Sequence, residues 1–315
     1  MLKDVILTVD KLDITTIIAG IEWKNPVTVA SGTFASGREY SSFVDLDKLG
    51  AITTKGVSFR PWVGNPPPRI AETHCGMLNA IGLQNPGIEA FIRDEIPYLK
   101  SLKTNIIVNV CGHNISEYCA VVERLSEVDA VDMLEINISC PNVSEGGMVF
   151  GTNWKMTEKI VKAVKEIAKQ PIIVKLSPNV TDIDVIARAA ESAGADALSM
   201  INTLIGMKID IKTRRPLLAN RIGGLSGSAI KPVAIRMVYQ VAQAVKIPII
   251  GMGGISSGED AIEMFLAGAS AVAIGTANFA NPRATMDVID GIWDYMQENN
   301  IKSIKELTGL SWKKW

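Results

Sequence analysis

The sequence predicts an α/β protein of the (β/α)8 class, the TIM barrel, and three observations lead to this prediction. First, eight short β-rich runs recur along the 315 residues. Second, amphipathic stretches separate most of these runs, as in a chain that alternates strand and helix. Third, the eight units span about 250 residues, which is the usual size of such a barrel. No low-complexity linker interrupts the chain, so we expect residues 1–315 to form one barrel domain.

The predicted strands are the apolar runs, and the segments around them have expected places in the barrel. The runs lie at residues 27–32, 51–57, 106–112, 133–140, 172–177, 197–203, 247–254 and 271–277. Before the first run, the turn signal IAGIEWKNP predicts a hairpin that plugs the bottom of the barrel. Long insertions at 57–86 and 204–228 follow the second and sixth runs, and we expect them to cover the top.

The predicted helices lie between the runs, at residues 153–170, 182–194, 229–246 and 258–269. In the first of them, apolar residues recur at the spacing of one helix face: Met156, Ile160, Val161, Val164 and Ile167. For the last, Ser256 followed by Glu259 three residues later predicts a capping box that opens the helix.

Composition limits the classes of ligand and the compartment. With 32 basic and 33 acidic residues, the net charge is -1, which gives no electrostatic reason to expect nucleic acid or an anionic membrane as a partner. No segment approaches 18 consecutive apolar residues, and charges are scattered through the N-terminal residues, so we expect a cytoplasmic protein that binds a small ligand. The cysteines, Cys75, Cys111, Cys119 and Cys140, include no CxxC pair; we expect free thiols and no metal site in this chain.

The segment LEINISCPN, residues 134–142, is an apolar run that ends abruptly in polar residues. This pattern is typical of a buried parallel strand that ends at the rim of an active site. It delivers Asn137, Ser139, Cys140 and Asn142 within a few positions, and Pro141 stops the strand. A thiol can release and take up a proton near neutral pH, so Cys140 is a candidate acid or base. Taken alone, the segment fits a small buried cysteine at a strand-end turn equally well.

Polar residues or glycines stand at the end of each predicted strand, and a barrel brings these positions to one mouth. They are Ser31, Lys55, Asn109, Asn137, Lys175, Asn202, Thr203, Gly253, Gly254, Gly275 and Thr276. Taken singly, each of these residues is a type that is common in turns and loops. The two lysines lie in otherwise apolar strands, where an ammonium needs an acceptor, and we expect a bound anionic or carbonyl-rich ligand to supply it.

The glycine pairs of the last two strands predict a phosphate site. In barrels, the loops after strands seven and eight commonly bind phosphate, and Gly253–Gly254 and Gly275–Thr276 occupy those places. These residues do not match the dinucleotide-binding motif GxGxxG of a Rossmann fold. After Gly251 and Gly253, Ser256 stands where the motif requires its third glycine. The phosphate of FMN therefore fits better than that of NAD.

Over residues 22 to 280, the chain resembles the class 1 dihydroorotate dehydrogenases. The resemblance is carried by GMLNAIGLQNPG (76–87), NISCPNVSEGGMVFGT (137–152), VKLSPNVTDI (174–183) and NTLIGMKID (202–210). These motifs are similar to those of the 1B catalytic subunit, because SEGG follows the CPNV element where the 1A form usually has a proline and a lysine.

The resemblance implies roles for individual residues. Positions that match FMN-binding residues are Ser31, Lys55, Gly56, Asn109, Asn137, Lys175, Ile201, Gly227, Gly253, Gly254, Gly275 and Thr276. Positions that match substrate-binding residues are Lys55, Asn79, Ala80, Ile81, Gly82, Leu83, Asn137, Asn202 and Thr203. Cys140 matches the catalytic base. His74 and Cys75 depart from the family pattern, and we expect His74 to be a solvent-facing loop residue and Cys111 a small buried filler.

The implied reaction is the oxidation of (S)-dihydroorotate to orotate in de novo pyrimidine (UMP) biosynthesis. The substrate loses a proton from C5 to Cys140 and a hydride from C6 to the flavin, while Lys175 stabilises the reduced ring. Gly146 and Gly147 suit a lid after Cys140. The 1B resemblance further implies a homodimer of this chain joined in a heterotetramer to a subunit that carries FAD and a 2Fe-2S cluster and passes electrons to NAD.

Four alternatives stay open. A class 1A enzyme would use fumarate as the acceptor. A dihydropyrimidine dehydrogenase shares the SCP element but usually has histidine where Asn142 stands. A non-redox barrel would use Lys175 for Schiff-base chemistry and the glycines for a substrate phosphate. A binding barrel without catalysis would leave Cys140 and both strand lysines unexplained.

Overall fold

Eight parallel strands form the central sheet of the computed structural model, which describes residues 12–139, 144–145 and 148–313. The strand order is β3-β18-β17-β12-β11-β8-β7-β4. The bounds are β3 (Val27–Val29), β4 (Ala51–Thr53), β7 (Asn105–Val110), β8 (Met133–Asn137), β11 (Ile172–Lys175), β12 (Ala197–Met200), β17 (Ile249–Met252) and β18 (Ala271–Ile274). The first and last strands of this order meet, because the N–H of Gly50 donates to the carbonyl of Val27 (3.0 Å) and the hydroxyls of Thr28 and Thr53 lie 3.2 Å apart. The predicted TIM barrel is confirmed.

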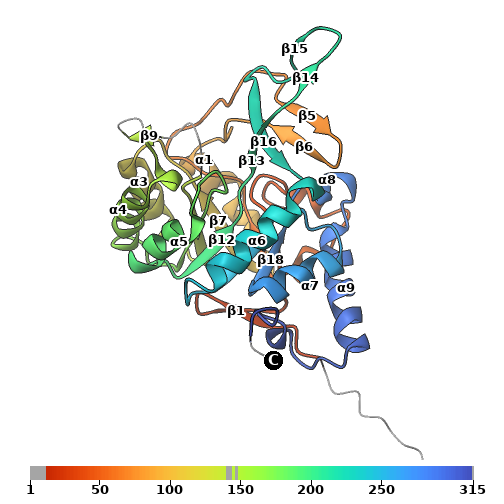
Figure 1. The fold of residues 1–315 in the computed structure, drawn as a ribbon. Helices are drawn as coiled ribbons and strands as arrows, with labels where there is room; N and C mark the ends of the chain where they lie inside the picture. Colours follow the sequence, from red (N-terminus) through yellow and green to blue (C-terminus); the bar gives the residue numbers. More distant parts are fainter. Residues whose placement is uncertain (1–11, 140–143, 146–147, 314–315) are drawn as a thin grey trace, which may run out of the picture.

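Helices surround the barrel (Figure 1). They are α1 (Ile88–Asp94), α2 (Ile96–Leu99), α3 (Ile115–Leu125), α4 (Trp154–Lys165), α5 (Ile183–Ser192), α6 (Lys231–Ala242), α7 (Gly258–Ala267), α8 (Ala277–Ala280) and α9 (Ala284–Glu298). The four predicted helices are α4, α5, α6 and α7. In α4, Ile160, Val161 and Val164 are buried as predicted. Ile167 lies beyond the end of the helix and is exposed, so its place on the buried face was wrongly predicted.

The cap of α7 lies one residue later than predicted. Ser257, and not Ser256, is the N-cap, and Asp260 takes the place expected for Glu259. The Asp260 carboxylate accepts the N–H groups of both Ser256 (2.8 Å) and Ser257 (3.1 Å), while Lys231 Nζ donates to it at 2.7 Å. In SSGED, Ser256 is followed three residues later by Glu259, and Ser257 by Asp260, so either pair could form the capping box. The ion pair of Asp260 with Lys231 favours the second pair.

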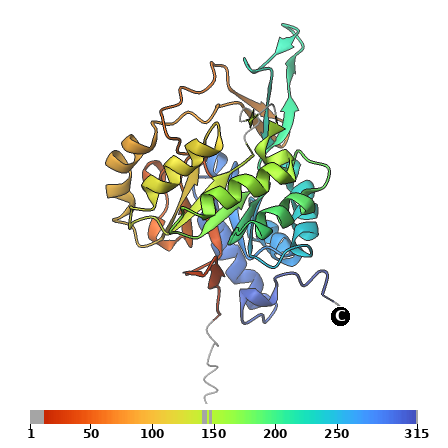
Figure 2. The same ribbon diagram turned by 90° about the vertical axis from the view of Figure 1, so that its left-hand side faces the viewer.

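A hairpin closes the bottom of the barrel, as predicted (Figure 2). Its strands are β1 (Thr16–Ile18) and β2 (Ile21–Trp23), paired antiparallel. Ile18 and Trp23 are fully buried and pack in one cluster with residues from the beginnings of the barrel strands, among them Ile107, Met133 and Ile173. Burial of these side chains stabilises the barrel at the end opposite the strand termini that carry polar groups.

The two long insertions meet above the barrel in a second sheet (Figure 1). Its strands, in the order β13-β16-β6-β5, are β13 (Leu204–Met207), β16 (Ile222–Ser226), β6 (Gly76–Asn79) and β5 (Ile70–Thr73). Shorter pairs are β14 (Ile209–Asp210) with β15 (Arg215–Pro216), and β9 (Ser144–Glu145) with β10 (Met148–Val149). One face of the four-stranded sheet buries Ala71, Leu78 and Ala80. The predicted cover is therefore confirmed. Within the part of the chain that the structure describes, no helix is both long and apolar enough to cross a membrane.

Candidate active site

A cavity of about 850 Å³ lies between the C-terminal ends of the barrel strands and the sheet above them. Its lining includes nearly all the residues that the sequence analysis singled out, although they come from distant parts of the chain. These are Ser31, Lys55, Gly56, Asn79, Ala80, Ile81, Gly82, Leu83, Asn137, Lys175, Ile201, Asn202, Thr203, Gly227, Gly253, Gly254, Gly275 and Thr276. Asn109 lies outside the lining, and Cys140 lies outside the described residues.

Lys175 occupies the floor of the cavity and is 3% exposed. Its ammonium donates to Ser31 Oγ at 3.0 Å and lies 3.5 Å from Glu135 Oε1. The prediction that a bound ligand must supply the acceptor is wrong for Lys175, because Glu135 on the neighbouring strand supplies it. Schiff-base chemistry needs an unprotonated amine, so this ion pair speaks against the non-redox alternative.

Glu135 is a residue that the sequence analysis missed. It lies in the middle of β8 and is 2% exposed. Its Oε1 accepts from Asn109 Nδ2 at 2.5 Å, and its Oε2 accepts from Ser199 Oγ at 2.7 Å. The available signal was the one used for Lys175, a charged residue inside an apolar strand, and it applies equally to the glutamate of LEINI.

Asn109 carries an unsatisfied acceptor beside the cavity. Its side-chain oxygen is buried and has no hydrogen-bond partner in the structure. A Cβ at Gly56, which lines the cavity, would lie 3.0 Å from that oxygen. A buried acceptor without a donor costs free energy, so a ligand that brings an N–H group to this wall would be stabilised. The imide N–H of a flavin ring is a group of this kind, and the site fits FMN on this observation.

Glycines shape the other end of the cavity, where the sequence analysis expected phosphate. Gly254 has φ +79°, and a Cβ there would lie 2.6 Å from Lys231 Cβ. Gly227 has φ +98°, and a Cβ there would lie 2.6 Å from Gly76 Cα. Both positions therefore need glycine, for conformation and for space. Beside them, Thr276 Oγ1 donates to Ser226 Oγ at 2.7 Å, which leaves polar groups at the cavity wall.

Amide side chains from separate elements line the part of the cavity nearest β8. Asn202 Nδ2 lies 3.5 Å from Asn137 Oδ1, and the carbonyl of Asn137 accepts from the buried Tyr118 hydroxyl at 2.6 Å. Asn79, on β6, reaches the cavity from above. Amides offer both donors and acceptors, which suits a ring that carries N–H and C=O groups. Asn179 was missed by the sequence analysis; its amide holds the start of β13 through Ile205 N–H (3.0 Å).

Lys55 projects from the end of β4 and is only partly buried. Burial, with a smaller contribution from the positive charge of Arg69, lowers the pKa of Lys55 below its usual value. Arg69 lines the same cavity and was also missed by the sequence analysis. The two cations make this wall attractive to a carboxylate.

Cys140 lies directly after the last described residue of this segment. The preceding residue, Ser139, is anchored, because its Oγ donates to the carbonyl of Lys175 at 2.8 Å. Cys140, Asn142, Gly146 and Gly147 lie outside the described residues, so the base and the lid stay predictions. His74 is exposed and Cys111 is buried, as the sequence analysis expected.

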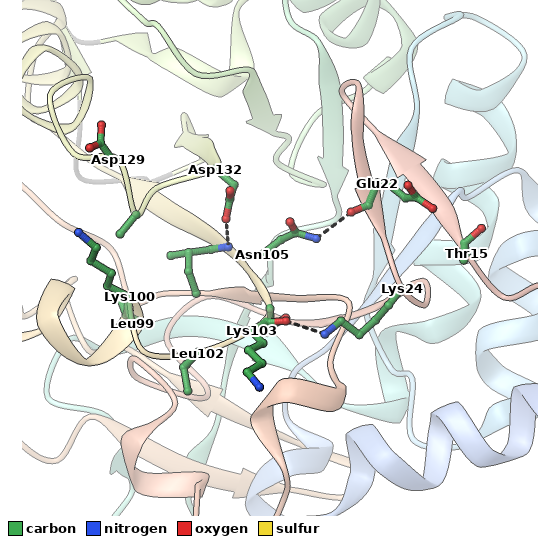
Figure 3. A pocket seen from close by; sticks show the side chains of 13 residues that line it. Thr15, Glu22, Lys24, Leu99, Lys100, Leu102, Lys103, Asn105, Asp129 and Asp132 are labelled. Carbon is green, nitrogen blue, oxygen red and sulfur yellow. Dashed lines mark hydrogen bonds between the residues drawn. The ribbon is translucent and has the colours of Figure 1, made fainter.

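A second cavity, of about 640 Å³, lies at the opposite end of the barrel, beside the β1–β2 hairpin (Figure 3). Its polar groups bind the protein itself. Lys24 Nζ donates to the carbonyls of Asp47 and Lys103, each at 2.6 Å, and Asp132 accepts from Ile106 N–H at 2.7 Å. Burial raises the pKa of Asp132. These bonds join the strand beginnings, so we assign this cavity a structural role.

Comparison with known proteins gives a consistent result. A family model described as dihydroorotate dehydrogenase matches residues 13–296. The catalytic subunit of dihydroorotate dehydrogenase B (NAD(+)) from Alkaliphilus oremlandii is 64% identical over 292 residues, covering 93% of this chain and 96% of the relative. The subunit of the same name from Geotalea uraniireducens is 55% identical over 299 residues, covering 95% and 98%. Among solved structures, a dihydroorotate dehydrogenase from Eimeria tenella in complex with ferulenol has a TM-score of 0.80 at 22% identity, covering 98% of this chain and 91% of that one, a likeness of fold.

Proposed function

Because the chain belongs to the dihydroorotate dehydrogenase family, we propose that it is the catalytic subunit of a class 1B enzyme, which oxidises dihydroorotate to orotate in pyrimidine biosynthesis. The observation that carries the proposal is the meeting of three features in one cavity: the buried cation Lys175, the glycine-lined end and the group of asparagine amides. Each feature matches a part of the reaction, which needs a flavin, a phosphate anchor for it and a pyrimidine site.

FMN is the cofactor that this site would hold. Its phosphate would lie at Gly227, Gly253, Gly254, Gly275 and Thr276, where the backbone leaves room for close approach. Lys175, Ser31, Gly56 and Ile201 of the lining, with the unpartnered oxygen of Asn109 behind Gly56, would hold its ring. When bound, FMN supplies a two-electron acceptor for a hydride. Lys175 would contribute a fixed positive charge that stabilises the reduced ring.

The substrate would lie between the flavin and the sheet above. Lys55 would pair with its carboxylate, and Asn79, Asn137, Asn202 and Thr203 would meet its ring amides and carbonyls. The loop from Ala80 to Leu83 would cover it. Cys140 would take the proton from C5 while C6 gives up its hydride. The residue before it, Ser139, is anchored to the carbonyl of Lys175, whose side chain lines the cavity.

The proposed assembly is a heterotetramer of two copies of this chain with two subunits that carry FAD and a 2Fe-2S cluster. The printed name of the relatives supports a partner, because each is called the catalytic subunit of an NAD(+)-dependent enzyme. Ile70, Ile205 and Ile222, although half exposed, share one face of the upper sheet and line the cavity, so we assign that face to the site and not to the subunit contact.

An acceptor assay tests the proposal. With dihydroorotate as the donor, the purified chain should reduce artificial acceptors but reduce NAD poorly, and co-purification with the partner subunit should restore NAD reduction. The reason is that the chain has no Rossmann fingerprint with which to bind NAD. Efficient NAD reduction by the isolated chain would refute the two-subunit arrangement. Efficient fumarate reduction would indicate the 1A mode instead.

A further inference from the structure

Glu135 is a buried carboxylate to which the proposed reaction assigns no role. Its side chain is 3% exposed and it does not line the cavity, so it touches neither substrate nor solvent in the cavity. Three side chains surround it, each from a different strand: Asn109 from β7, Lys175 from β11 and Ser199 from β12. A group held by this many converging partners has one orientation, and that orientation directs a negative charge at Lys175 from beneath the cavity floor.

The strand register explains how the network forms. Glu135 pairs with Asn109 across β8 and β7, and Lys175 pairs with Ser199 across β11 and β12. In a barrel, inward-pointing residues of neighbouring strands stack in layers. Across β8 and β11, Glu135 is in register with Ile173, two residues before Lys175, so the carboxylate lies one layer below the ammonium; of the two, only Lys175 lines the cavity.

The free energy of burying a charge explains why Lys175 needs Glu135. Burial of an ammonium without a counter-charge is unfavourable and disfavours the protonated form of the amine. Lys175 has a counter-charge whether or not the cavity is filled, because Glu135 belongs to the barrel itself.

We propose that Glu135 is a positioning residue that keeps Lys175 protonated in both redox states of the flavin. The inference rests on the proposed function, because it concerns FMN in this cavity. In the reaction, the hydride from C6 of dihydroorotate adds to the flavin and the C5 proton goes to the base, so no further proton is taken up at Lys175. Without the carboxylate, burial would disfavour the ammonium of Lys175 beside oxidised flavin, and an anionic ring would favour it, so that reduction would draw a proton from solvent to the amine.

The test is the pH dependence of the FMN reduction potential in the holoprotein, measured with a chemical reductant. For a two-electron reduction, each proton taken up shifts the potential by about 30 mV per tenfold change in proton concentration. The wild type should show the slope of one proton. Glu135→Gln should approach the slope of two protons, about 59 mV per pH unit. In Glu135→Gln/Lys175→Met, which has no amine to protonate, the slope should return to one proton.

Ser199→Ala is the matched control, because it removes a hydrogen bond to the same carboxylate but no charge. Its slope should equal that of the wild type. Other titratable or charged groups around the pair are Lys55 and Arg69 on the cavity walls, Cys111 after β7 and Tyr118 on α3. All four are unchanged in every variant, so their contributions cancel in the comparison.

Two results would overturn the proposal. One is an unchanged slope in Glu135→Gln, which would leave Glu135 a purely structural residue. The other is a two-proton slope in the wild type, which decides the question even where the variant fails to fold. Because dihydroorotate is absent from the measurement, a wrong substrate assignment would leave this result intact, whereas failure to bind FMN would refute the proposed function first.

Discussion

The two lysines of the cavity differ in their surroundings, and the difference suggests different tasks. Lys175 is paired with a carboxylate on the neighbouring strand. Lys55 lies on a wall shared with Arg69, and burial lowers its pKa. An ammonium with its own counter-charge is a permanent feature of the site, while one that is destabilised in the empty cavity gains most from an arriving anion.

Lys55 should therefore make orotate binding depend on pH. Binding of the carboxylate favours the ammonium, so affinity is full at pH values below the lowered pKa of Lys55 and falls as pH rises through it. Lys55→Met should weaken orotate binding at neutral pH by about 10- to 100-fold, since a hydrogen bond to a charged group contributes about 1.5–3 kcal/mol, and should abolish the alkaline loss. Orotate titrations monitored by flavin absorbance measure both effects. Lys208→Met, at an exposed lysine, is the control; wild-type binding by Lys55→Met would contradict the assignment.

Cys140 carries the second residue-level prediction, which rests on the family resemblance. Cys140→Ser should retain FMN and bind orotate, yet lose about 10² to 10⁴ in the rate of flavin reduction near neutral pH, because a hydroxyl is a far poorer proton acceptor. The loss should ease as pH rises. Cys75→Ser, Cys111→Ser and Cys119→Ser are the matched controls and should keep most of the rate. Rapid-mixing absorbance measures it, and a Cys140→Ser rate equal to the wild type would exclude this base.

At the scale of elements, the positions of strands and helices could be predicted from sequence, whereas their exact ends and distant partners could not. The eight barrel strands were found, but each ends before its predicted limit, because the predicted runs included polar residues such as Ser31 and Asn202, which lie in the loops after the strands. The pairing of β16 with β6 joins residues about 145 positions apart, for example Gly224 with Asn79. Hydrophobic periodicity is local and carries no information about such a partner.

The site residues follow the same rule. Positions at strand ends were predictable because a barrel collects them at one mouth. For Glu135, its charge within an apolar strand could have marked it as a candidate, but its partners lie on three other strands and nothing in the pentapeptide LEINI indicates them. Arg69 and Asn179 were missed because their importance comes from the folding of the insertions over the cavity.

The loop after β17 supports a prediction about the cofactor. Gly254→Val should abolish FMN retention, because the new Cβ would lie 2.6 Å from Lys231 Cβ and the position has φ +79°. Gly20→Val is the matched control, since Gly20 has a similar φ of +83° but nothing within 4 Å of its Cβ position, at the far end of the barrel. Gly20→Val should strain the backbone as much as Gly254→Val does, yet the protein should keep its FMN. The flavin content of the purified proteins is the measurement, and undiminished FMN in Gly254→Val would show that the phosphate lies elsewhere.

At the scale of the whole molecule, the two ends of the barrel have separate tasks. The lower end is sealed by Ile18 and Trp23 of the hairpin and by hydrogen bonds among the strand beginnings. The upper end holds the cavity, the binding candidates and the second sheet that covers them. Stability and chemistry are thereby divided between opposite faces, as is usual for barrel enzymes, and only the upper face needs to be reached by substrate and by the partner subunit.

The proposed reaction is the transfer of a hydride from dihydroorotate to FMN in this cavity. Anaerobic mixing of the FMN-loaded chain with dihydroorotate tests it most directly, because the measurement needs neither the partner subunit nor any external acceptor. The flavin absorbance should bleach, and one orotate should form for each FMN reduced. Flavin that stays oxidised in the fully loaded protein at saturating dihydroorotate would contradict it.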